Sequence, residues 1–350
     1  MMATLQVVPE LRNYHVDLLT DDVAALLYFD EKYDLEQRTS RDERIRQVSV
    51  MGAVVEAFSS DCDTLDIFEP LWVRNLHKWA VIAFAWKIGH VMRRSRVVSY
   101  CMENNSISAL VAGRGRNRRL VTWVFTRVLG LAMSIVYTRL AFASSGAAAT
   151  YQRLRLSPRV RSQVFTSLPS PDPLAVTSGD RSGVVFVGRL EERKGIESLM
   201  RAWSVVEEQL PDARLDIIGD GPMAPEVRAW ATTERRAFHS SMAHSLVKSL
   251  LLERSVLVLP SIRSGRWREQ IGLPILEGLS AGCTIVASDE TGLAEWLADQ
   301  GHRVYDSSSS TGLVGALLAA LNQPLQVREV VASLPSVPTR KTAVEWLRRA

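Results

Sequence analysis

The chain alternates short apolar runs with stretches of helical periodicity, and this alternation constrains its fold more than any other feature. Short, nearly continuous apolar runs are typical of strands that are buried on both faces. Strands that are joined through helices form parallel sheets with helices packed on their faces. The sequence therefore predicts an α/β fold.

The alternation has two parts. In the first half we expect strands and helices at these positions: strands over 64–70, 96–102 and 140–145, and helices over 40–60, 71–94, 117–140 and 146–154. Within the second helix Trp72, Trp79 and Trp86 are seven residues apart, which puts them on one face. In the second half we expect strands over 183–188, 213–219, 255–260 and 283–288, with a helix over 196–210.

A stretch rich in Ser, Pro, Asp and Gly, residues 167–182, separates the two parts and predicts an interdomain linker. We expect a first domain over 1–167, a linker over 168–182, and a second domain over 183–338. A C-terminal helix over 339–350 is expected to pack back on the first domain.

Charge is distributed unevenly along the chain. Residues 1–69 contain 6 Lys and Arg against 15 Asp and Glu, whereas residues 70–162 contain 16 Lys and Arg and a single acid, Glu103. A basic segment of this kind attracts an anionic partner such as a phospholipid surface. The three cysteines form no CxxC or Cys/His cluster, which fits a reducing cytosol and gives no support to a metal site.

Two glutamates, Glu269 and Glu277, flank a turn formed by Gly272, Leu273 and Pro274. The turn stands directly before a predicted helix, where unpaired backbone N–H groups suit phosphate or sugar oxygens. Carboxylates on either side can accept hydrogen bonds from sugar or ribose hydroxyls. The segment predicts a binding site for a sugar or nucleotide.

Three further motifs follow predicted strands. Gly188 and Arg189 end one strand and Lys194 stands before the next helix, a pair of cations that can neutralise a diphosphate. Gly219 and Ser261 lie at the ends of two other strands. The carboxyl ends of parallel strands meet at one edge of a sheet, so we expect all four elements to line one crevice.

Together GRLEERKG (188–195), IIGDGP (217–222), LPS (259–261) and the E-x7-E spacing of Glu269 and Glu277 resemble the retaining glycosyltransferases of family 4. Those enzymes have the GT-B fold, two Rossmann-like domains with parallel sheets that face a cleft. The resemblance implies that Arg189 and Lys194 hold the diphosphate of a nucleotide sugar, that Glu277 binds the ribose, and that Glu269 with the backbone of 272–274 holds the donor sugar. The expected donor-binding set is Gly188, Arg189, Lys194, Gly219, Ser261, Gly272, Leu273, Pro274 and Glu277.

The first half departs from the family pattern. Its first forty residues contain no glycine, so the glycine-rich loop after the first strand is missing and the N-terminus is divergent or shortened. Many family members carry a histidine at the end of an acceptor-domain strand, and the equivalent place here is Glu103-Asn104-Asn105. Glu103 could position the acceptor hydroxyl, and with Glu269 it is our candidate catalytic residue. A turn or helix-cap cluster is the alternative.

The resemblance implies transfer of a hexose from a UDP- or GDP-linked sugar to a glycan or lipid-linked acceptor, with no cofactor. No second carboxylate pair demands double displacement, so front-face transfer with retention is favoured. The triplet Asp61-Cys62-Asp63 precedes a strand instead of following one, so we expect no metal. GRGRNR (113–118) fails the dinucleotide pattern.

The basic segments 71–96 and 114–140 raise the question of a membrane. The longest uncharged run, Val128 to Thr138, is 11 residues, too short to span a bilayer. Arginines leading into an apolar helix, with the tryptophan series, favour peripheral attachment to an anionic surface. We expect a cytoplasmic protein, peripheral on the inner face of the cell membrane. Two alternatives remain: a nucleotide-sugar-binding protein without transferase activity, and a nucleic-acid binder, which only the basic region suggests.

Overall fold

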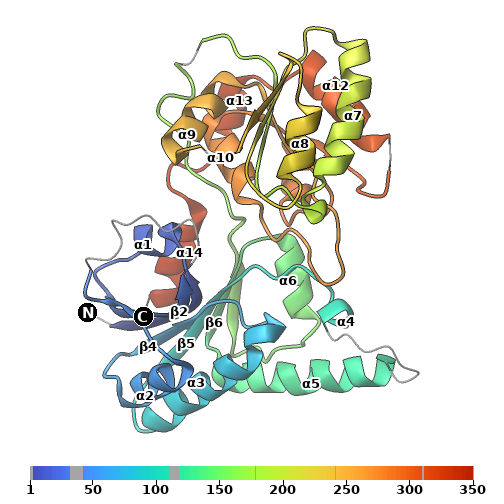
Figure 1. Ribbon diagram of the computed structural model, residues 1–350. Coiled ribbons are helices and arrows are strands. Elements are labelled where there is room, and N and C mark those ends of the chain that lie inside the picture. Colours follow the sequence, from blue (N-terminus) through green and yellow to red (C-terminus); the bar gives the residue numbers. More distant parts are fainter. Residues whose placement is uncertain are drawn as a thin grey trace. The chain divides into compact units, whose positions relative to one another are not determined.

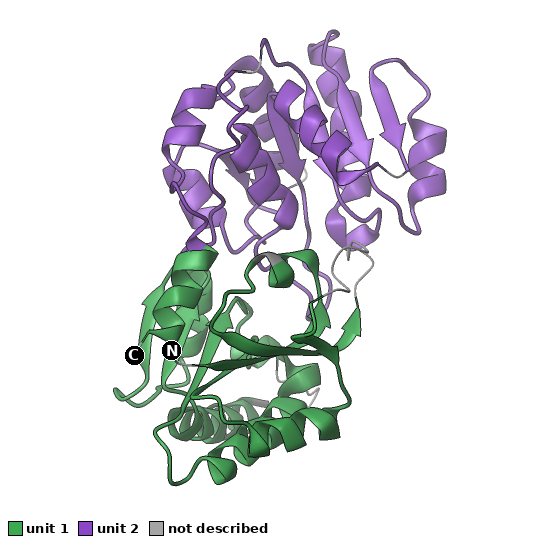
Figure 2. Ribbon diagram, turned by 90° about the vertical axis from the view of Figure 1, so that its left-hand side faces the viewer, with its two compact units in different colours: residues 1–165, 340–350 green, residues 166–339 purple. Residues whose placement is uncertain are grey.

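The computed structural model describes residues 3–31, 42–110, 118–177, 179–240, 242–309 and 311–349. It divides into two compact units (Figure 2): unit 1 comprises residues 1–165 and 340–350, and unit 2 comprises residues 166–339. The segment predicted as a linker, 168–182, is part of unit 2, where the backbone N–H of Asp172 donates to the carbonyl of Ser280.

Unit 1 is built on a seven-stranded parallel sheet (Figure 1) with the order β3-β2-β1-β4-β5-β6-β7. Its strands are β1 (Thr4–Leu11), β2 (Val23–Glu31), β3 (Ile45–Gln47), β4 (Thr64–Ile67), β5 (Arg96–Cys101), β6 (Arg139–Phe142) and β7 (Arg161–Val164). The strand order reverses between β1 and β4, and open α/β sheets bind ligands at the carboxyl ends of the strands at such a reversal.

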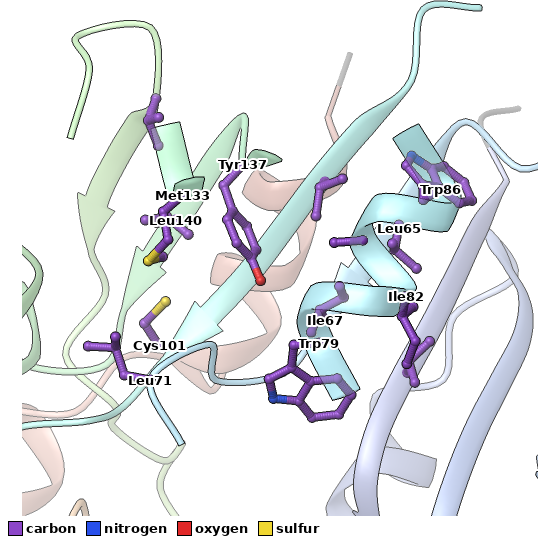
Figure 3. Close-up of a cluster of buried hydrophobic side chains, with 14 of the residues drawn as sticks. Leu65, Ile67, Leu71, Trp79, Ile82, Trp86, Cys101, Met133, Tyr137 and Leu140 are labelled. Atoms are coloured by element: carbon purple, nitrogen blue, oxygen red, sulfur yellow. The ribbon is translucent and has the colours of Figure 1, made fainter. Parts of the chain in front are cut away.

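The helices of unit 1 are α1 (Asn13–Asp17), α2 (Val50–Ser59), the 3-10 turn η2 (Val73–Asn75), α3 (Leu76–Gly89), α4 (Ile107–Leu110), α5 (Arg118–Val136), α6 (Ser145–Gln152) and α14 (Thr339–Arg348). Helix α3 packs against both α2 and α5. Its Trp79, Ile82 and Trp86 cover Leu65 and Ile67 of β4 (Figure 3). The alternate residue of β4, Asp66, points to the opposite face, where it meets Arg348 of α14.

Several elements of unit 1 differ from the sequence-based prediction. The helix predicted over 40–60 is wrong, because β3 occupies 45–47 and the helix begins only at Val50; residues 40 and 41 lie outside the described residues. The strand predicted over 140–145 begins at Arg139 and ends at Phe142, since Ser144 caps α6. The helix over 71–94 is confined to 76–89, after η2. Strands β1 and β2 were not predicted at all.

Unit 2 contains a six-stranded parallel sheet of order β10-β9-β8-β11-β12-β13. Its strands are β8 (Val184–Val187), β9 (Leu215–Ile218), β10 (Arg236–His239), β11 (Val256–Leu259), β12 (Thr284–Ser288) and β13 (Arg303–Tyr305). Its helices are the 3-10 turn η3 (Glu192–Lys194), α7 (Ile196–Gln209), α8 (Ala224–Trp230), α9 (His244–Glu253), α10 (Leu273–Ala281), α11 (Ala294–Asp299), α12 (Gly312–Asn322) and α13 (Val327–Ala332).

The two faces of this second sheet are covered by different helices. Helices α7 and α12 pack together on one face, and α10 packs with α9 and α13 on the other (Figure 1). The central strands β9, β11 and β12 are fully buried, which is why they read as continuous apolar runs. The order reverses between β8 and β11, so the ligand edge of unit 2 is expected where these two strands end.

Candidate functional site

The ends of β8 and β9 lie unusually close together in unit 2. Gly219 has a φ of 151°, and a Cβ atom placed on it would come within 1.8 Å of the carbonyl oxygen of Gly188. Only glycine fits such an approach. Arg189 follows this contact with a side chain that is 51% exposed and 3.8 Å from Glu191, so its guanidinium is available at the strand end.

Lys194 and Glu269 form an ion pair at the end of β11, although they are 75 residues apart in sequence. The Lys194 ammonium donates to Oε2 of Glu269, and the hydroxyl of Ser261 donates to the same oxygen at 3.0 Å. Ser261 and Glu269 are both buried. The sequence motifs of β8 and β11 thus meet in one hydrogen-bonded cluster at the strand-order reversal.

Trp267 packs against this cluster. The Arg193 guanidinium lies 4.2 Å and the Lys194 ammonium 5.2 Å from the centre of its rings, which are cation–π distances. The backbone also closes here, because the N–H of Ile262 donates to the carbonyl of Arg193. Arg193 and Lys194 are therefore held in place by the loop that follows β11.

The loop 261–272 is fixed in turn to the segment after β12. Arg268 pairs with the buried Glu290 at 2.7 Å. The Thr291 hydroxyl donates to the carbonyl of Ile271 at 2.7 Å, and the N–H of Gly292 donates to the carbonyl of Gln270. These contacts fix the position of Glu269 from both sides.

Helix α10 starts at the predicted turn. Gly272 is the residue before it, in the left-handed region with φ of 87°, and Pro274 stands in its first turn, where a missing N–H costs nothing. Glu277 lies one turn further on, with a side chain that is 33% exposed and 3.9 Å from Nδ1 of His244. Burial raises the pKa of Glu277, and the nearby His244 opposes this.

Unit 1 places Glu103 at the carboxyl end of β5, as the sequence suggested, but in a buried network. One oxygen of its carboxylate accepts from the backbone N–H and from the side-chain amide of Asn105, each at 2.9 Å. The Thr150 hydroxyl donates to the carbonyl of Asn105 at 3.1 Å. The hydrogen bonds between Glu103 and Asn105 are those of a turn cluster, which was the alternative to a catalytic part for Glu103.

Sequence reasoning missed Glu69, which stands two residues after the end of β4 and contacts the backbone of Glu103. Its side chain is fully buried and accepts hydrogen bonds from Tyr151 and from the backbone N–H groups of Leu71, Met102 and Glu103. The available signal was an acid between a buried strand and a proline. The sequence-based prediction includes Glu69 only as part of the strand over 64–70.

Three other sequence motifs remain. Asp61, in the triplet considered for metal, pairs with Arg93 at 2.7 Å with a side chain that is 90% exposed. Among the described residues there is no group of three His, Cys, Asp or Glu side chains that could hold a metal ion. The tryptophan series was wrong as a surface feature, because Trp79 and Trp86 are buried in the core. Residues 113–117 of GRGRNR, with Arg114 and Arg116, lie outside the described residues.

The fold matches solved glycosyltransferase structures over nearly its whole length. WaaG, a glycosyltransferase involved in lipopolysaccharide biosynthesis, has a TM-score of 0.64 at 14% identity, with 99% of this chain and 100% of that chain covered. An α,α-trehalose-phosphate synthase from Burkholderia xenovorans has a TM-score of 0.65 at 12% identity, with both chains covered completely. The chain therefore has the GT-B glycosyltransferase fold.

The sequence comparisons concern unit 2. Residues 181–323 match the family model described as Glycosyl transferases group 1. A GDP-mannose-dependent alpha-(1-6)-phosphatidylinositol monomannoside mannosyltransferase from Mycolicibacterium smegmatis is 31% identical over 47% of this chain and 45% of its own. An alpha-D-kanosaminyltransferase from Streptomyces kanamyceticus is 30% identical over 34% of this chain and 31% of its own. These alignments span less than half the length of either relative.

Proposed function

We propose that this chain is a retaining glycosyltransferase that moves a sugar from a nucleotide-diphosphate sugar to a hydroxyl of a glycan or lipid-linked acceptor. The observation that carries this proposal is the cluster of Lys194, Glu269 and Ser261 at the strand-order reversal of unit 2. It lies within the residues that match the glycosyltransferase family model.

Each group in the cluster has a proposed part in donor binding. Arg189 and Lys194 neutralise the diphosphate, which requires Lys194 to exchange part of its contact with Glu269 for phosphate oxygens. Glu269 and the backbone of Gly272, Leu273 and Pro274 then hold the sugar hydroxyls, and Glu277 accepts from the ribose. The carboxylates suit this part because they act only as acceptors.

In the transfer step the bond from the anomeric carbon to the diphosphate oxygen breaks, and a bond to the acceptor oxygen forms on the same face. The proton of the acceptor hydroxyl passes to the departing diphosphate. Stabilisation of the developing negative charge by Arg189 and Lys194 is the largest contribution of the protein. Glu103 is the candidate that positions the acceptor hydroxyl, and the reaction needs no metal or other cofactor.

Donor binding is tested first with a thermal-shift panel of UDP- and GDP-linked sugars, followed by product analysis with membrane extracts as the source of acceptor. The proposal expects stabilisation by one donor series and a product that retains the anomeric configuration. A GDP-mannose-dependent relative and UDP-forming structural neighbours make both series worth testing. An inverted product, or turnover that is lost in excess chelator and restored by added metal, would contradict the mechanism.

A second candidate function is nucleotide-sugar binding without transfer. The observation that favours it is the direct passage of β1 into α1 through Arg12, with no glycine at this loop. Stabilisation by a nucleotide sugar, with no product from any acceptor in the extract, would identify this function. Salt-dependent binding of nucleic acid without nucleotide binding would contradict both candidates.

We also propose that unit 1 attaches peripherally to an anionic membrane through α3 and α5. In the described part of the chain α5 is long and apolar enough to cross a membrane by length and composition, and 17% of its apolar window is buried. However, its Leu129 and Met133 pack into the core of unit 1, which favours a helix lying along a surface. Exposed apolar side chains line the other faces of α5 and α3: Leu120, Val121, Trp123, Val124, Val128, Leu131 and Ile135, with Val81, Phe84 and Ile88.

The charge of these helices fits the same proposal. Residues 70–162 carry 16 Lys and Arg and one acid, and Arg119 and Arg127 stand on α5 itself. Basic side chains next to exposed apolar ones bind anionic lipid through both attraction and burial. Flotation with liposomes should recover the protein with anionic lipid and not with neutral lipid alone, as expected of a protein that binds the anionic inner face of the cell membrane.

A further inference from the structure

We infer that Glu69 is a positioning residue for transfer: its carboxylate holds the backbone that presents Glu103 at the carboxyl end of β5. The inference rests on the proposed function, because Glu103 has a catalytic part only there. Glu69 itself is fully buried and reaches no exterior surface, so it acts through the segment that it holds.

The contacts of Glu69 join three separate elements. Its Oε1 accepts from the Tyr151 hydroxyl at 2.6 Å, on α6, and from the N–H of Leu71 at 3.1 Å, before η2. Its Oε2 accepts from the N–H of Met102 and, at 2.8 Å, from that of Glu103, directly after β5. A single side chain thus holds the two residues that follow β5, including Glu103 itself.

The position in the sheet supports a functional interpretation. Glu69 follows β4, which borders β1 where the strand order of unit 1 reverses, and this is where α/β sheets place ligands. Its φ of 46° lies in the left-handed region, which is rare for a residue with a side chain and tends to be kept at functional sites.

All four partners of Glu69 are donors, so both oxygens must act as acceptors, and the ionised form fits this arrangement best. A proton on either oxygen would face an N–H or hydroxyl donor. Burial and the neighbouring Glu103 carboxylate nevertheless raise the pKa of Glu69 to about 7, against the opposing effect of its hydrogen bonds. The other titratable groups that face it are Tyr151, Cys101 and Tyr137.

The order of the turn should therefore change near neutral pH. Above pH 7 Glu69 is ionised and holds the backbone of Met102 and Glu103. Below pH 7 one carboxylate oxygen gains a proton, and the two hydrogen bonds that this oxygen accepts weaken. We expect turnover to fall as pH drops through about 7, with kcat affected and the KM for the donor unchanged, since the donor-binding residues are in unit 2.

The test compares the full chain with three variants. Glu69→Gln keeps the shape of the side chain, but it replaces one acceptor oxygen with an amide NH2 group, a donor that faces the donors around it. Tyr151→Phe removes one hydrogen bond that favours ionisation. Asp66→Asn is the control, because Asp66 is another buried acid of β4 but pairs with Arg348 instead of the turn. We would measure kcat and donor KM from pH 5.5 to 9, and amide hydrogen exchange of residues 102–105, with exchange rates corrected for pH.

Glu69→Gln should lower kcat at pH 8 by tenfold or more, remove the acid limb and leave the donor KM within twofold. It should also accelerate exchange at 102–105. Tyr151→Phe should move the fall of kcat at low pH to higher pH. Asp66→Asn should lower the melting temperature but change neither the pH dependence of kcat nor the exchange at 102–105. Wild-type kcat, acid limb or exchange rates in Glu69→Gln would overturn the inference.

Exchange separates this inference from the proposed function. If the wild-type chain transfers no sugar from any donor of the UDP- and GDP-linked panel to an acceptor in the membrane extract, the proposed function fails. Faster exchange at 102–105 in Glu69→Gln would still establish that Glu69 holds the turn, whereas unchanged exchange would overturn the inference as well.

Discussion

Lys194 and Glu269 are an ion pair whose side chains are only 14% and 11% exposed. Taking both charges out of water is expensive, so such a pair is weak evidence of stability and more informative as a prepared binding site. A diphosphate would offer Lys194 a stronger anion than Glu269 alone. In the proposed function, the ion pair keeps the Lys194 ammonium ordered before the nucleotide sugar binds.

Lys194→Ala should reduce transfer at least about 100-fold, the loss typical of removing one group that stabilises developing charge. It also leaves Glu269 buried without its cation, a change that costs roughly 3–5 kcal/mol of stability. Melting curves must show that the variant is folded at the assay temperature. Arg201→Ala is the control, because Arg201 pairs with Glu197 on an exposed helix surface and should change neither activity nor stability. Near-wild-type turnover in Lys194→Ala would exclude the donor-site assignment.

Glu69 also makes stability depend on pH. Its pKa is raised from 4.5 to about 7 in the folded chain, so the folded state binds more protons than the unfolded state between those values. Stability must then fall as pH rises from about 4.5 to 7, by about 3 kcal/mol from this group. Urea unfolding of unit 1 at pH 5 and pH 8 measures the difference. The same difference in Glu69→Gln would show that another group is responsible.

At the level of elements, unit 2 was more predictable than unit 1. Strands β9, β11 and β12 are buried on both faces and short, so their apolar runs are visible in the sequence, and glycines mark where β8 and β9 end. Strand β1 contains Pro9 and no neighbouring glycine, and β3 has only three residues, so neither gives a local pattern. Their place is decided by pairing with β2 and β4.

Burial of a polar side chain is equally invisible in a local pattern. Glu69 stands before Pro70 in a segment that reads as a strand end, and its four donors come from residues up to 82 positions away. Trp79 and Trp86 show the opposite error, since helical spacing identified their shared face but not that this face is turned inward.

Helix α5 allows the membrane proposal to be tested without disturbing the fold. Leu131 is 66% exposed, so Leu131→Glu should leave the melting temperature unchanged and weaken flotation with anionic liposomes about tenfold, through lost apolar burial and added repulsion. Leu174→Glu makes the same substitution at a 57% exposed position of unit 2 and should float like the wild type. Equal flotation of both variants would exclude α5 as the attachment surface.

At the level of the whole molecule, the chain returns to its first unit at the end. Within unit 1, Arg348 of α14 pairs with Asp66 at 3.3 Å and with Asp22 at 3.5 Å. Arg139 donates to the carbonyls of Trp346 and Arg349. Residues 340–350 therefore complete a unit whose other residues precede 166.

This arrangement predicts that weakening the contacts of α14 lowers the stability of unit 1 and not that of unit 2. Arg348→Ala leaves the carboxylate of Asp66, whose pKa burial already raises, without its main opposing cation. Unit 1 should lose roughly 3–5 kcal/mol of stability, as expected when one partner of a buried pair is removed. Two calorimetric transitions should result, of which only the one not shifted by UDP or GDP moves to lower temperature.

Lys341→Ala is the control, because Lys341 lies on the exposed side of the same helix, and it should move neither transition. A fall of the nucleotide-sensitive transition in Arg348→Ala would mean that the two units unfold together and that α14 supports both.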